Sequence, residues 1–410
     1  MSAGPGRGRM LLLLGSLYLA QGLPYGFLTQ AVPVLLRLEG ASLTTISGSR
    51  LLLLPWLLKV LWAPLVDRWH RPALGRRRSW LLPVQAASVL LFAAFALVPY
   101  DSVMTVLLWA TFLTALLAAT QDIATDGLAV TLLSPAQRGL GNGVQVAAYR
   151  LGMVVGGGAL LAVFADAGWG VSAASMAGLL ALASLPVLFW REPPSPAPVA
   201  GPPWAAMRAM LRRPGVKAWL GLLVGYKVGE QAGGSLVKPL LVDAGLDLGA
   251  IGWLGAIDST ASLAGALAGG LWTTRLGTRR ALVVFGLGQA VFVAAWAWPA
   301  LTGDALAAAL VTIADGFVGS MATAALFTAM MERTRPADGG TEYTLQASVV
   351  LVAAFLGGGL AGPLADGVFG FLPGPAGYMT CFVLWAVITA MGAVLMRAAP
   401  AAVPLAAAPG

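Results

Sequence analysis

Long apolar stretches alternate with short polar breaks along the whole chain. A helix that spans a lipid bilayer needs about 20 consecutive, mostly apolar residues, and twelve stretches meet that requirement. The runs are continuous rather than alternating, which favours helices over the strands of a membrane barrel. The pattern therefore predicts an all-α integral membrane protein with twelve transmembrane helices. The predicted spans are residues 10–36, 43–66, 79–99, 103–133, 139–165, 169–190, 216–242, 249–274, 281–301, 305–331, 344–365 and 374–396.

Composition agrees with a chain that lies mostly in lipid. Of 410 residues, 58% are hydrophobic and only 10% are charged, and a soluble domain of this length cannot bury so much apolar surface in one core. The chain has a single cysteine, Cys381, and a single histidine, His70, so neither a metal site nor a cofactor is predicted. The chain has no Gly-Lys-Ser/Thr phosphate-binding loop, which argues against an ATP-driven pump.

The placement of charged residues predicts the topology. The net charge is +8, but nearly all basic residues outside the spans lie in alternate loops, and the other loops hold only Arg37. By the positive-inside rule both termini are cytoplasmic and the number of spans is even. The basic excess therefore reflects membrane topology and not nucleic-acid binding. We expect a multi-pass protein of the cell inner (cytoplasmic) membrane.

The chain is organised as two halves around a proline-rich linker at residues 191–215, in which a short amphipathic stretch is expected at 204–213. The amino-terminal half covers 1–190, the carboxy-terminal half 216–397, and a disordered tail 398–410. Landmarks repeat at an offset of about 200 residues. Two such landmarks are Gly75, Arg77 and Arg78, which match Gly277, Arg279 and Arg280, and Gln145, which matches Gln346.

Parallel six-helix repeats are the arrangement of major facilitator transporters, which bind substrate near the bilayer midplane. The loop after the second span, Ala63 to Trp69 and then Gly75 to Trp80, resembles an expanded form of the signature of that superfamily. The resemblance implies a fold of two six-helix halves. It also implies a conformational gate that steadies the contact between spans two and eleven and caps helix ends electrostatically. The gate residues are Asp67, Arg68, Gly75, Arg76, Arg77 and Arg78.

Further segments resemble the branch of muropeptide permeases and acetyl-coenzyme A transporters. They are Gln21–Gly26, Gln121–Gly127 with Ala148–Gly152, and Gly225–Gln231, and within the branch the likeness is greatest to a short animal member. The resemblance implies a transporter without enzymatic activity. From these segments we expect substrate or ion contacts at Gln21, Tyr25, Gln121, Tyr149, Tyr226 and Gln231.

Ten ionisable residues fall inside the predicted spans. Each costs at least about 2.5–3.5 kcal/mol near the bilayer centre, so they are expected to pair or to face a wet path. They are Arg50, Lys59, Asp122, Asp126, Arg150, Lys227, Glu230, Lys238, Asp258 and Asp315. At a rise of about 1.5 Å per residue, Asp122 and Arg150 lie at one depth and Asp126 and Lys59 at another. Two ion pairs, Asp122 with Arg150 and Asp126 with Lys59, are predicted.

The roles of these charges leave two interpretations open. Asp122 and Asp126 share one helix face at i, i+4, so their repulsion favours a proton switch, whereas a permanent structural network is the alternative. Lys227 and Glu230 share a face at i, i+3, and Lys227 either binds an anionic group of the substrate or forms a static pair with Glu230.

The resulting prediction is a secondary active transporter, monomeric and working by alternating access. It moves a polar, anionic, muropeptide-like small molecule and is coupled to protons. One alternative is a transporter or exchanger of acetyl-coenzyme A or a similar anionic metabolite, and another is a non-transporting receptor or lipid scramblase. An intramembrane enzyme is disfavoured because no histidine lies in the spans for a serine dyad.

Overall fold

The computed structural model describes residues 6–42, 45, 48–193 and 201–400, and within these the side chains of all but 50, 101–106, 108 and 248. Every regular element among the described residues is helical.

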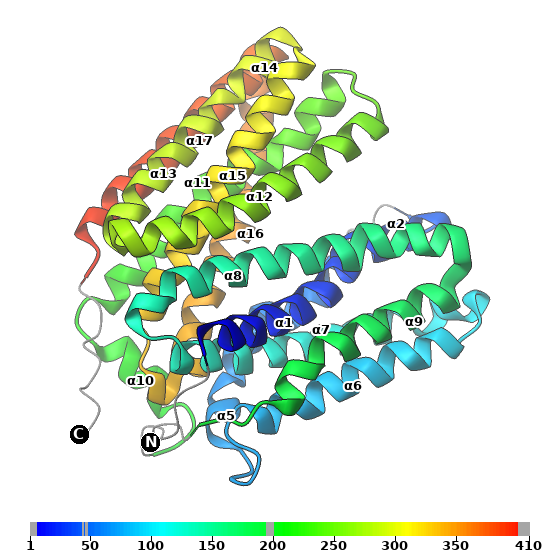
Figure 1. Ribbon diagram of the computed structural model, residues 1–410. Coiled ribbons are helices and arrows are strands. Elements are labelled where there is room, and N and C mark those ends of the chain that lie inside the picture. The colour runs from blue at the N-terminus through cyan, green and yellow to red at the C-terminus, as the bar shows by residue number, and fades with distance from the viewer. Residues whose placement is uncertain (1–5, 43–44, 46–47, 194–200, 401–410) are drawn as a thin grey trace. The chain divides into compact units, whose positions relative to one another are not determined.

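The chain divides into two compact units (Figure 1). Unit 1 comprises Met1–Ser134, Ala148–Ala209 and Thr334–Ser348, and unit 2 comprises Pro135–Ala147, Met210–Arg333 and Val349–Gly410. Each unit thus takes in one short segment from the opposite half of the sequence. The boundaries predicted for the halves, the linker and the tail stay predictions, and residues 194–200 and 401–410 lie outside the described chain.

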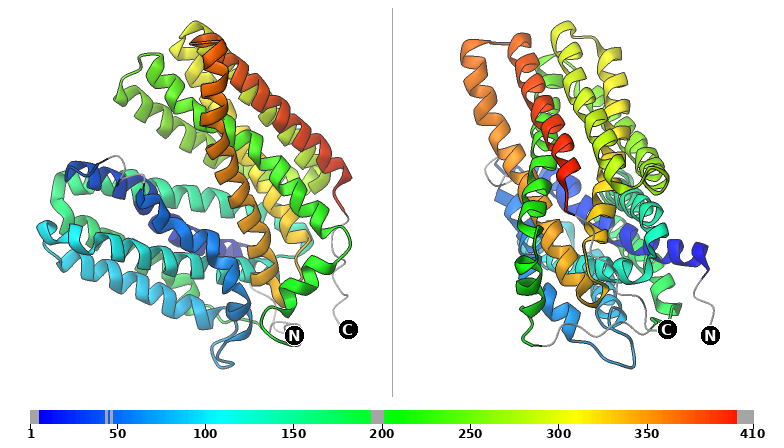
Figure 2. Two further views of the ribbon diagram at one scale, coloured as in Figure 1. Left: turned by 180° about the vertical axis from the view of Figure 1, so that it is seen from behind. Right: turned by 90° about the vertical axis from the view of Figure 1, so that its left-hand side faces the viewer.

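Unit 1 is built around α1, which packs against α7 and α9, while α6 packs on both of those helices (Figure 2). Its elements are α1 (Arg7–Gly26), the π-helical turn η1 (Phe27–Ala31), α2 (Val32–Leu38), the 3₁₀ turn η2 (Arg50–Leu53), α4 (Leu54–Leu58), the 3₁₀ turn η3 (Lys59–Leu61), α5 (Ala63–Arg68), α6 (Arg78–Leu97), α7 (Tyr100–Leu132), the π-helical turn η4 (Val155–Ala159), α9 (Leu160–Phe189) and η5 (Pro336–Asp338).

Unit 2 holds α11, α13 and α17 side by side, with α15 packed between α13 and α12 (Figures 1 and 2). Its elements are α11 (Val216–Asp243), α12 (Leu248–Leu276), α13 (Thr278–Ala295), α14 (Ala297–Thr302), α15 (Ala305–Glu332), α17 (Pro375–Leu395) and η6 (Met396–Ala398). Three helices contribute to both units: α8 (Pro135–Val154), α10 (Ala205–Arg212) and α16 (Gly339–Phe371). Helix α10 coincides with the amphipathic stretch expected in the linker.

Seven helical segments of the described chain are long and apolar enough to cross a membrane. They are Arg7–Leu38, Arg78–Leu97, Pro135–Phe189, Thr278–Thr302, Ala305–Glu332, Pro336–Phe371 and Pro375–Ala398. The segment Pro135–Phe189 contains a kink at Gly168, where φ is 80°, and this glycine falls between the fifth and sixth predicted spans. The chain is therefore a multi-pass membrane protein, and the count of twelve spans stays a prediction.

The segment that corresponds to the predicted second span is broken rather than continuous. Pro55 stands in the first turn of α4 and Pro64 in the first turn of α5, and 3₁₀ turns precede both helices. Proline lacks the backbone N–H of a helix interior, so each proline begins a new helix instead of continuing the previous one. The 3₁₀ turns rise about 2.0 Å per residue, against about 1.5 Å in an α-helix, which shifts the residues beyond them along the axis.

Glycines allow close helix contact in each unit. In unit 1 a methyl group on Gly152 of α8 would meet the carbonyl oxygen of Leu19 at 2.5 Å, so α1 and α8 approach backbone to backbone. In unit 2 a methyl group on Gly269 of α12 would meet the backbone of Met321 in α15. Such small-residue contacts are typical of helices packed in lipid.

Candidate functional site

A buried ion pair joins two elements of unit 1. Lys59 Nζ, in the 3₁₀ turn η3, contacts a carboxylate oxygen of Asp122 in the middle of α7, and only 5% and 16% of the two side chains are exposed. A lone charge at such a position is very costly, because water is excluded and the effective dielectric constant is low. Each residue therefore depends on the other for its charge to be tolerated.

Asp126 lies one helical turn after Asp122 on the same face of α7. It is 2% exposed and accepts a hydrogen bond from the Tyr18 hydroxyl of α1 at 2.9 Å. A phenol donates well to a carboxylate, since a hydrogen bond to an ionised acceptor is stronger than one between neutral groups. Two carboxylates and one ammonium group thus lie within two turns of α7.

The observed pairing differs from the predicted pair of Asp122 with Arg150. Lys59 contacts Asp122, and Arg150 forms no ion pair with any described residue. The predicted pairing of Lys59 with Asp126 stays a prediction. The depth estimate treated the second span as a regular α-helix, whereas the three residues of η3 rise about 2.0 Å each instead of about 1.5 Å, which moves Lys59 about 1.5 Å deeper, toward the level of Asp122. Arg150 is half-buried in α8. The side chain of Arg50 lies outside the described part of the structure.

Amide and aromatic side chains continue this polar cluster along α1. Gln21 is 2% exposed, and neither of its amide atoms has a hydrogen-bond partner within the described chain. Gln121, beside Asp122 in sequence, donates to the carbonyl oxygen of Leu17 at 3.2 Å and so holds α7 against α1. The half-buried rings of Tyr25 and Tyr149 lie 5.6 Å apart between centroids.

Sequence reasoning missed two residues of this site. Tyr18 lies three residues before Gln21 and seven before Tyr25, so all three share one face of α1, and that spacing was a usable signal. Trp56 lies three residues before Lys59, and its ring centroid is 5.3 Å from that of Tyr25. Tryptophan in a membrane protein usually lies at the interface between lipid and water, so Trp56 was not expected beside the ion pair.

Unit 2 carries a different charged cluster on α11. Lys227 Nζ is 2.6 Å from a carboxylate oxygen of Glu230, three residues later, and 3.4 Å from the Thr323 hydroxyl of α15. Gln231 donates to the other Glu230 oxygen at 3.0 Å. The predicted proximity of Lys227 and Glu230 is confirmed. Tyr226 is buried and donates to the carbonyl oxygen of Leu282 at 3.0 Å, so it fastens α11 to α13.

The gate residues predicted in the loop after α5 surround one carboxylate. Asp67, 1% exposed, accepts from the backbone N–H of Thr341 at 2.6 Å, from the hydroxyl of the same residue at 2.5 Å and from the N–H of Gly340 at 3.2 Å. These donors belong to the first turn of α16, whose helix dipole favours a negative charge at that end. Asp67 therefore caps α16 within unit 1.

Two guanidinium groups complete the charge balance of the gate. Arg77 Nη1 lies 2.5 Å from Asp67 Oδ1 and Arg76 Nη2 lies 3.7 Å from it. Burial alone would raise the pKa of Asp67, but Arg77, Arg76 and the Thr341 hydrogen bonds outweigh burial and hold that pKa below its ordinary value. Burial, together with the neighbouring Arg77, lowers the pKa of Arg76 to about 10 despite the opposing charge of Asp67.

Glycines leave room around Asp67, and arginines of the same loop region bind backbone carbonyl groups of neighbouring segments. A methyl group on Gly340 would lie 2.7 Å from Asp67 Oδ1, so the close approach of α16 requires a glycine there. Gly75 adopts a φ of +94°, as its counterpart Gly277 does at +77°, which supports the repeat relation between these loops. Arg78 donates to the carbonyl oxygens of Val187 and Leu188, while Arg68 donates to that of Gly201.

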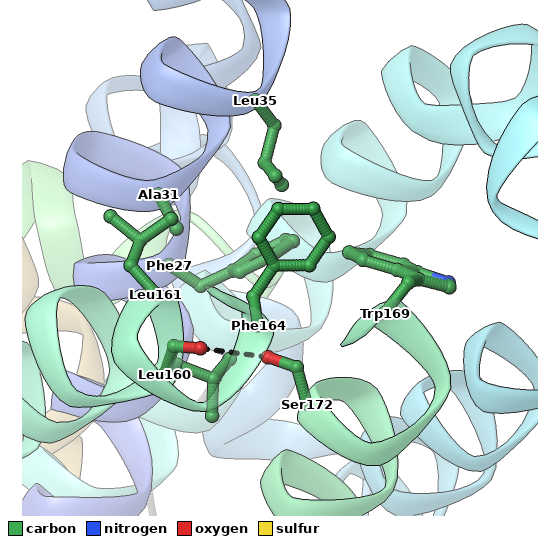
Figure 3. A pocket seen from close by; sticks show the side chains of 8 residues that line it. All are labelled: Phe27, Ala31, Leu35, Leu160, Leu161, Phe164, Trp169 and Ser172. Carbon is green, nitrogen blue, oxygen red and sulfur yellow. Dashed lines mark hydrogen bonds between the residues drawn. The ribbon is translucent and has the colours of Figure 1, made fainter. Parts of the chain in front are cut away.

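A separate hollow of about 190 Å³ lies between α1–α2 and α9 of unit 1. Figure 3 shows that its lining is apolar and aromatic, apart from Ser172, whose hydroxyl donates to the carbonyl oxygen of Leu160 at 2.9 Å. No ionisable side chain lines this hollow, so it does not suit a charged solute.

Comparison with known proteins identifies the fold and the family. The chain is 32% identical over 368 residues to the anhydromuropeptide permease of Escherichia coli, which covers 87% of this chain and 74% of the permease. Residues 10–165 match the family model described as acetyl-coenzyme A transporter 1. The structure is similar to the human organic anion transporter MFSD10 (TM-score 0.74, 16% identity, covering 96% of this chain and 100% of that one). It is also similar to the major facilitator transporter FucP (TM-score 0.67, 14% identity, covering 94% and 98%). The chain therefore has the fold of the major facilitator transporters and belongs to the family of anhydromuropeptide permeases, which makes it a secondary transporter.

Proposed function

We propose that this transporter carries a muropeptide-like solute, a sugar joined to a short acidic peptide, across the cell inner membrane by alternating access. The 32% identity with the anhydromuropeptide permease, extending over 87% of the chain, is the observation that carries the proposal. The proposed molecule is a monomer with twelve spans in two six-helix halves and with both termini in the cytoplasm. The placement of its basic residues supports that topology.

The cationic side chains of the site provide contacts for the acidic groups of such a solute. Arg150 has no ion-pair partner among the described residues, and its guanidinium is able to bind a carboxylate with two hydrogen bonds. Lys227 is shared between Glu230 and Thr323, so an incoming carboxylate competes with Glu230 for it. In unit 1, Gln21 contributes an amide with no partner in the described chain. Unit 1 thus offers both a charged group and a neutral hydrogen-bonding group, and unit 2 offers the ammonium group of Lys227.

Proton coupling is proposed to occur at Asp122 and Asp126. Lys59 neutralises one negative charge of the two, and Tyr18 stabilises Asp126 through a hydrogen bond. Uptake of a proton by either carboxylate changes how strongly Lys59 is held, because the attraction between charges is large in a buried site. Protonation therefore loosens the link between η3 and α7, and deprotonation restores it.

Uptake by proteoliposomes that contain the purified protein tests the proposal. Labelled anhydromuropeptide is offered with an imposed pH gradient, and again after an ionophore has collapsed the gradient. We expect saturable uptake that falls at least several-fold when the gradient is lost. Absence of uptake above that of empty liposomes contradicts the proposed substrate, and uptake that does not depend on the gradient contradicts proton coupling.

The match of residues 10–165 to the acetyl-coenzyme A transporter model favours a second candidate function, exchange of an anionic coenzyme A thioester. The same liposomes, preloaded with coenzyme A and offered labelled acetyl-coenzyme A, distinguish the two. Exchange of this label without anhydromuropeptide uptake favours the second candidate.

A further inference from the structure

Three aromatic side chains from three separate helices meet next to the ion pair of unit 1. Tyr25 of α1 lies 5.3 Å from Trp56 of α4 and 5.6 Å from Tyr149 of α8, measured between ring centroids. Trp56 and Lys59 are three residues apart and so lie on one side of their segment. We call Tyr25, Trp56 and Tyr149 the aromatic corner.

The polar atoms of the aromatic corner form no hydrogen bond that stabilises the described fold. The hydroxyls of Tyr25 and Tyr149 and the indole N–H of Trp56 form no hydrogen bond within the described part of the chain. In contrast, Tyr18, Tyr226 and Tyr378 donate to Asp126, to the carbonyl oxygen of Leu282 and to Asp243. Trp56 is buried and the two tyrosines are half-buried, so their three donors lie close together and are available to a ligand.

The angles between the rings indicate the shape of that ligand. The plane of Trp56 is at 84° to that of Tyr25, and the plane of Tyr149 is at 46° to it. A flat nucleobase stacks best in a slot between parallel rings, which these angles do not form. A pyranose ring presents C–H groups to an aromatic face and hydroxyls at its rim, so it suits an angled corner that has donors at its edges.

We infer that the aromatic corner binds the sugar ring of the transported solute, while Arg150 of the same unit holds its acidic peptide. This inference rests on the proposed function. It assigns to Trp56 the role of favouring a substrate that carries a sugar over a peptide without one. Lys59 follows Trp56 by three residues, and the Lys59–Asp122 pair belongs to the cluster proposed to couple transport to protons. Sugar binding is thereby placed next to the coupling site.

Competition with labelled anhydromuropeptide uptake tests the inference, with two unlabelled probes: the disaccharide of N-acetylglucosamine and the free acidic tripeptide. In Trp56→Leu we expect the inhibition constant of the disaccharide to rise about tenfold, because one stacking surface is lost, and that of the tripeptide to stay unchanged. Tyr149→Phe keeps the ring and loses one hydroxyl, and about a threefold rise is expected. Trp109→Leu is the matched control, since Trp109 is 78% exposed on α7.

Two results overturn the inference while leaving the proposed function intact. One is wild-type uptake with disaccharide inhibition that Trp56→Leu does not change, or changes equally for both probes. The other is stronger inhibition by adenosine 3′,5′-bisphosphate that is lost in Trp56→Leu, which assigns the corner to a nucleobase. Trp56→Phe guards against a folding defect, because it keeps an aromatic face and is expected to restore disaccharide inhibition to within about threefold of wild type. Lack of wild-type uptake contradicts the proposed function itself.

Discussion

The two units hold their buried charges in different ways. In unit 1 the pair of Lys59 and Asp122 joins two elements that are far apart in sequence, whereas in unit 2 Lys227 and Glu230 stand three residues apart on one continuous helix. A pair within one helix keeps its geometry when helices move, because the backbone fixes it. A pair between elements breaks when one slides past the other. The difference favours unit 1 as the place where the proposed proton coupling converts a change of charge into movement.

The backbone segments that carry the two ion pairs also differ. Lys59 lies in a segment interrupted by 3₁₀ turns and by Pro55 and Pro64, while α11 runs without interruption over 28 residues. Stretches of 3₁₀ helix inside a longer helix often mark a hinge. The side chain that pairs across elements therefore also lies on the backbone best able to bend.

The largest effect is expected from removal of the ammonium group in unit 1. Lys59→Met leaves Asp122 buried without its cation, so we expect a loss of about 4 kcal/mol in the free energy of unfolding and no measurable transport. Thermal unfolding in detergent and liposome uptake measure the two. Trp109→Leu serves as the control, and wild-type transport by Lys59→Met contradicts a functional role for the pair.

The next effect is expected at the gate. Asp67→Asn removes the charge that faces Arg77, Arg76 and the first turn of α16, and about 3 kcal/mol of stability should be lost. Because the pKa of Asp67 is held below its ordinary value, its stabilisation is complete above about pH 4 and declines as pH falls toward the lowered pKa. The stability difference between wild type and Asp67→Asn should therefore shrink on acidification. A difference that grows at low pH is the contrary result.

A smaller effect is expected in unit 2. Glu230 is 20% exposed, so Lys227→Met leaves behind a carboxylate that water can reach, and the folded state should lose only about 1 kcal/mol. If Lys227 binds an acidic group of the solute, KM rises about tenfold with little change in kcat. Glu230→Gln frees Lys227 and should lower KM instead. Equal KM values for all three proteins mean that the pair is static.

The smallest effect is expected from Tyr18→Phe. It deletes one hydrogen bond to Asp126 and leaves the ring in place, which costs about 1.5 kcal/mol. Transport should persist at a rate reduced several-fold, as measured by initial uptake. Tyr378→Phe, which loses a similar bond to Asp243, is the matched control and should transport normally.

Hydropathy and charge placement predicted the membrane class of the chain and the ends of most helices, because lipid constrains the sequence along the whole length of a span. The resemblance of the signature loop implied that its charges cap helix ends, and Asp67 does cap α16, while the gating role of the loop stays a prediction. The Lys227–Glu230 contact was also predictable, since three residues on a regular helix leave little choice of geometry.

Contacts between separate helices were harder to predict. A depth argument paired Asp122 with Arg150, because it compared positions along the helix axes and took no account of which neighbouring helix each side chain faces. Likewise Gly358 and Gly362 of α16 have a spacing typical of close helix contact, but a methyl group on either would meet nothing within 4 Å among the described residues, whereas Gly357 packs against Val228. Rotation of a helix about its axis depends on its neighbours, which a local pattern does not encode.

The most direct test of the account is the charge-neutral double substitution of Lys59→Met with Asp122→Asn. It removes both charges at once and leaves no buried carboxylate without its cation. The free energy of unfolding should therefore exceed that of Lys59→Met alone by about 2 kcal/mol or more. Uptake of labelled anhydromuropeptide under a pH gradient is then measured. A charge switch predicts a folded protein whose uptake no longer responds to the gradient. Wild-type uptake with an unchanged response to the gradient would show that the pair only holds the helices together, and would contradict the account.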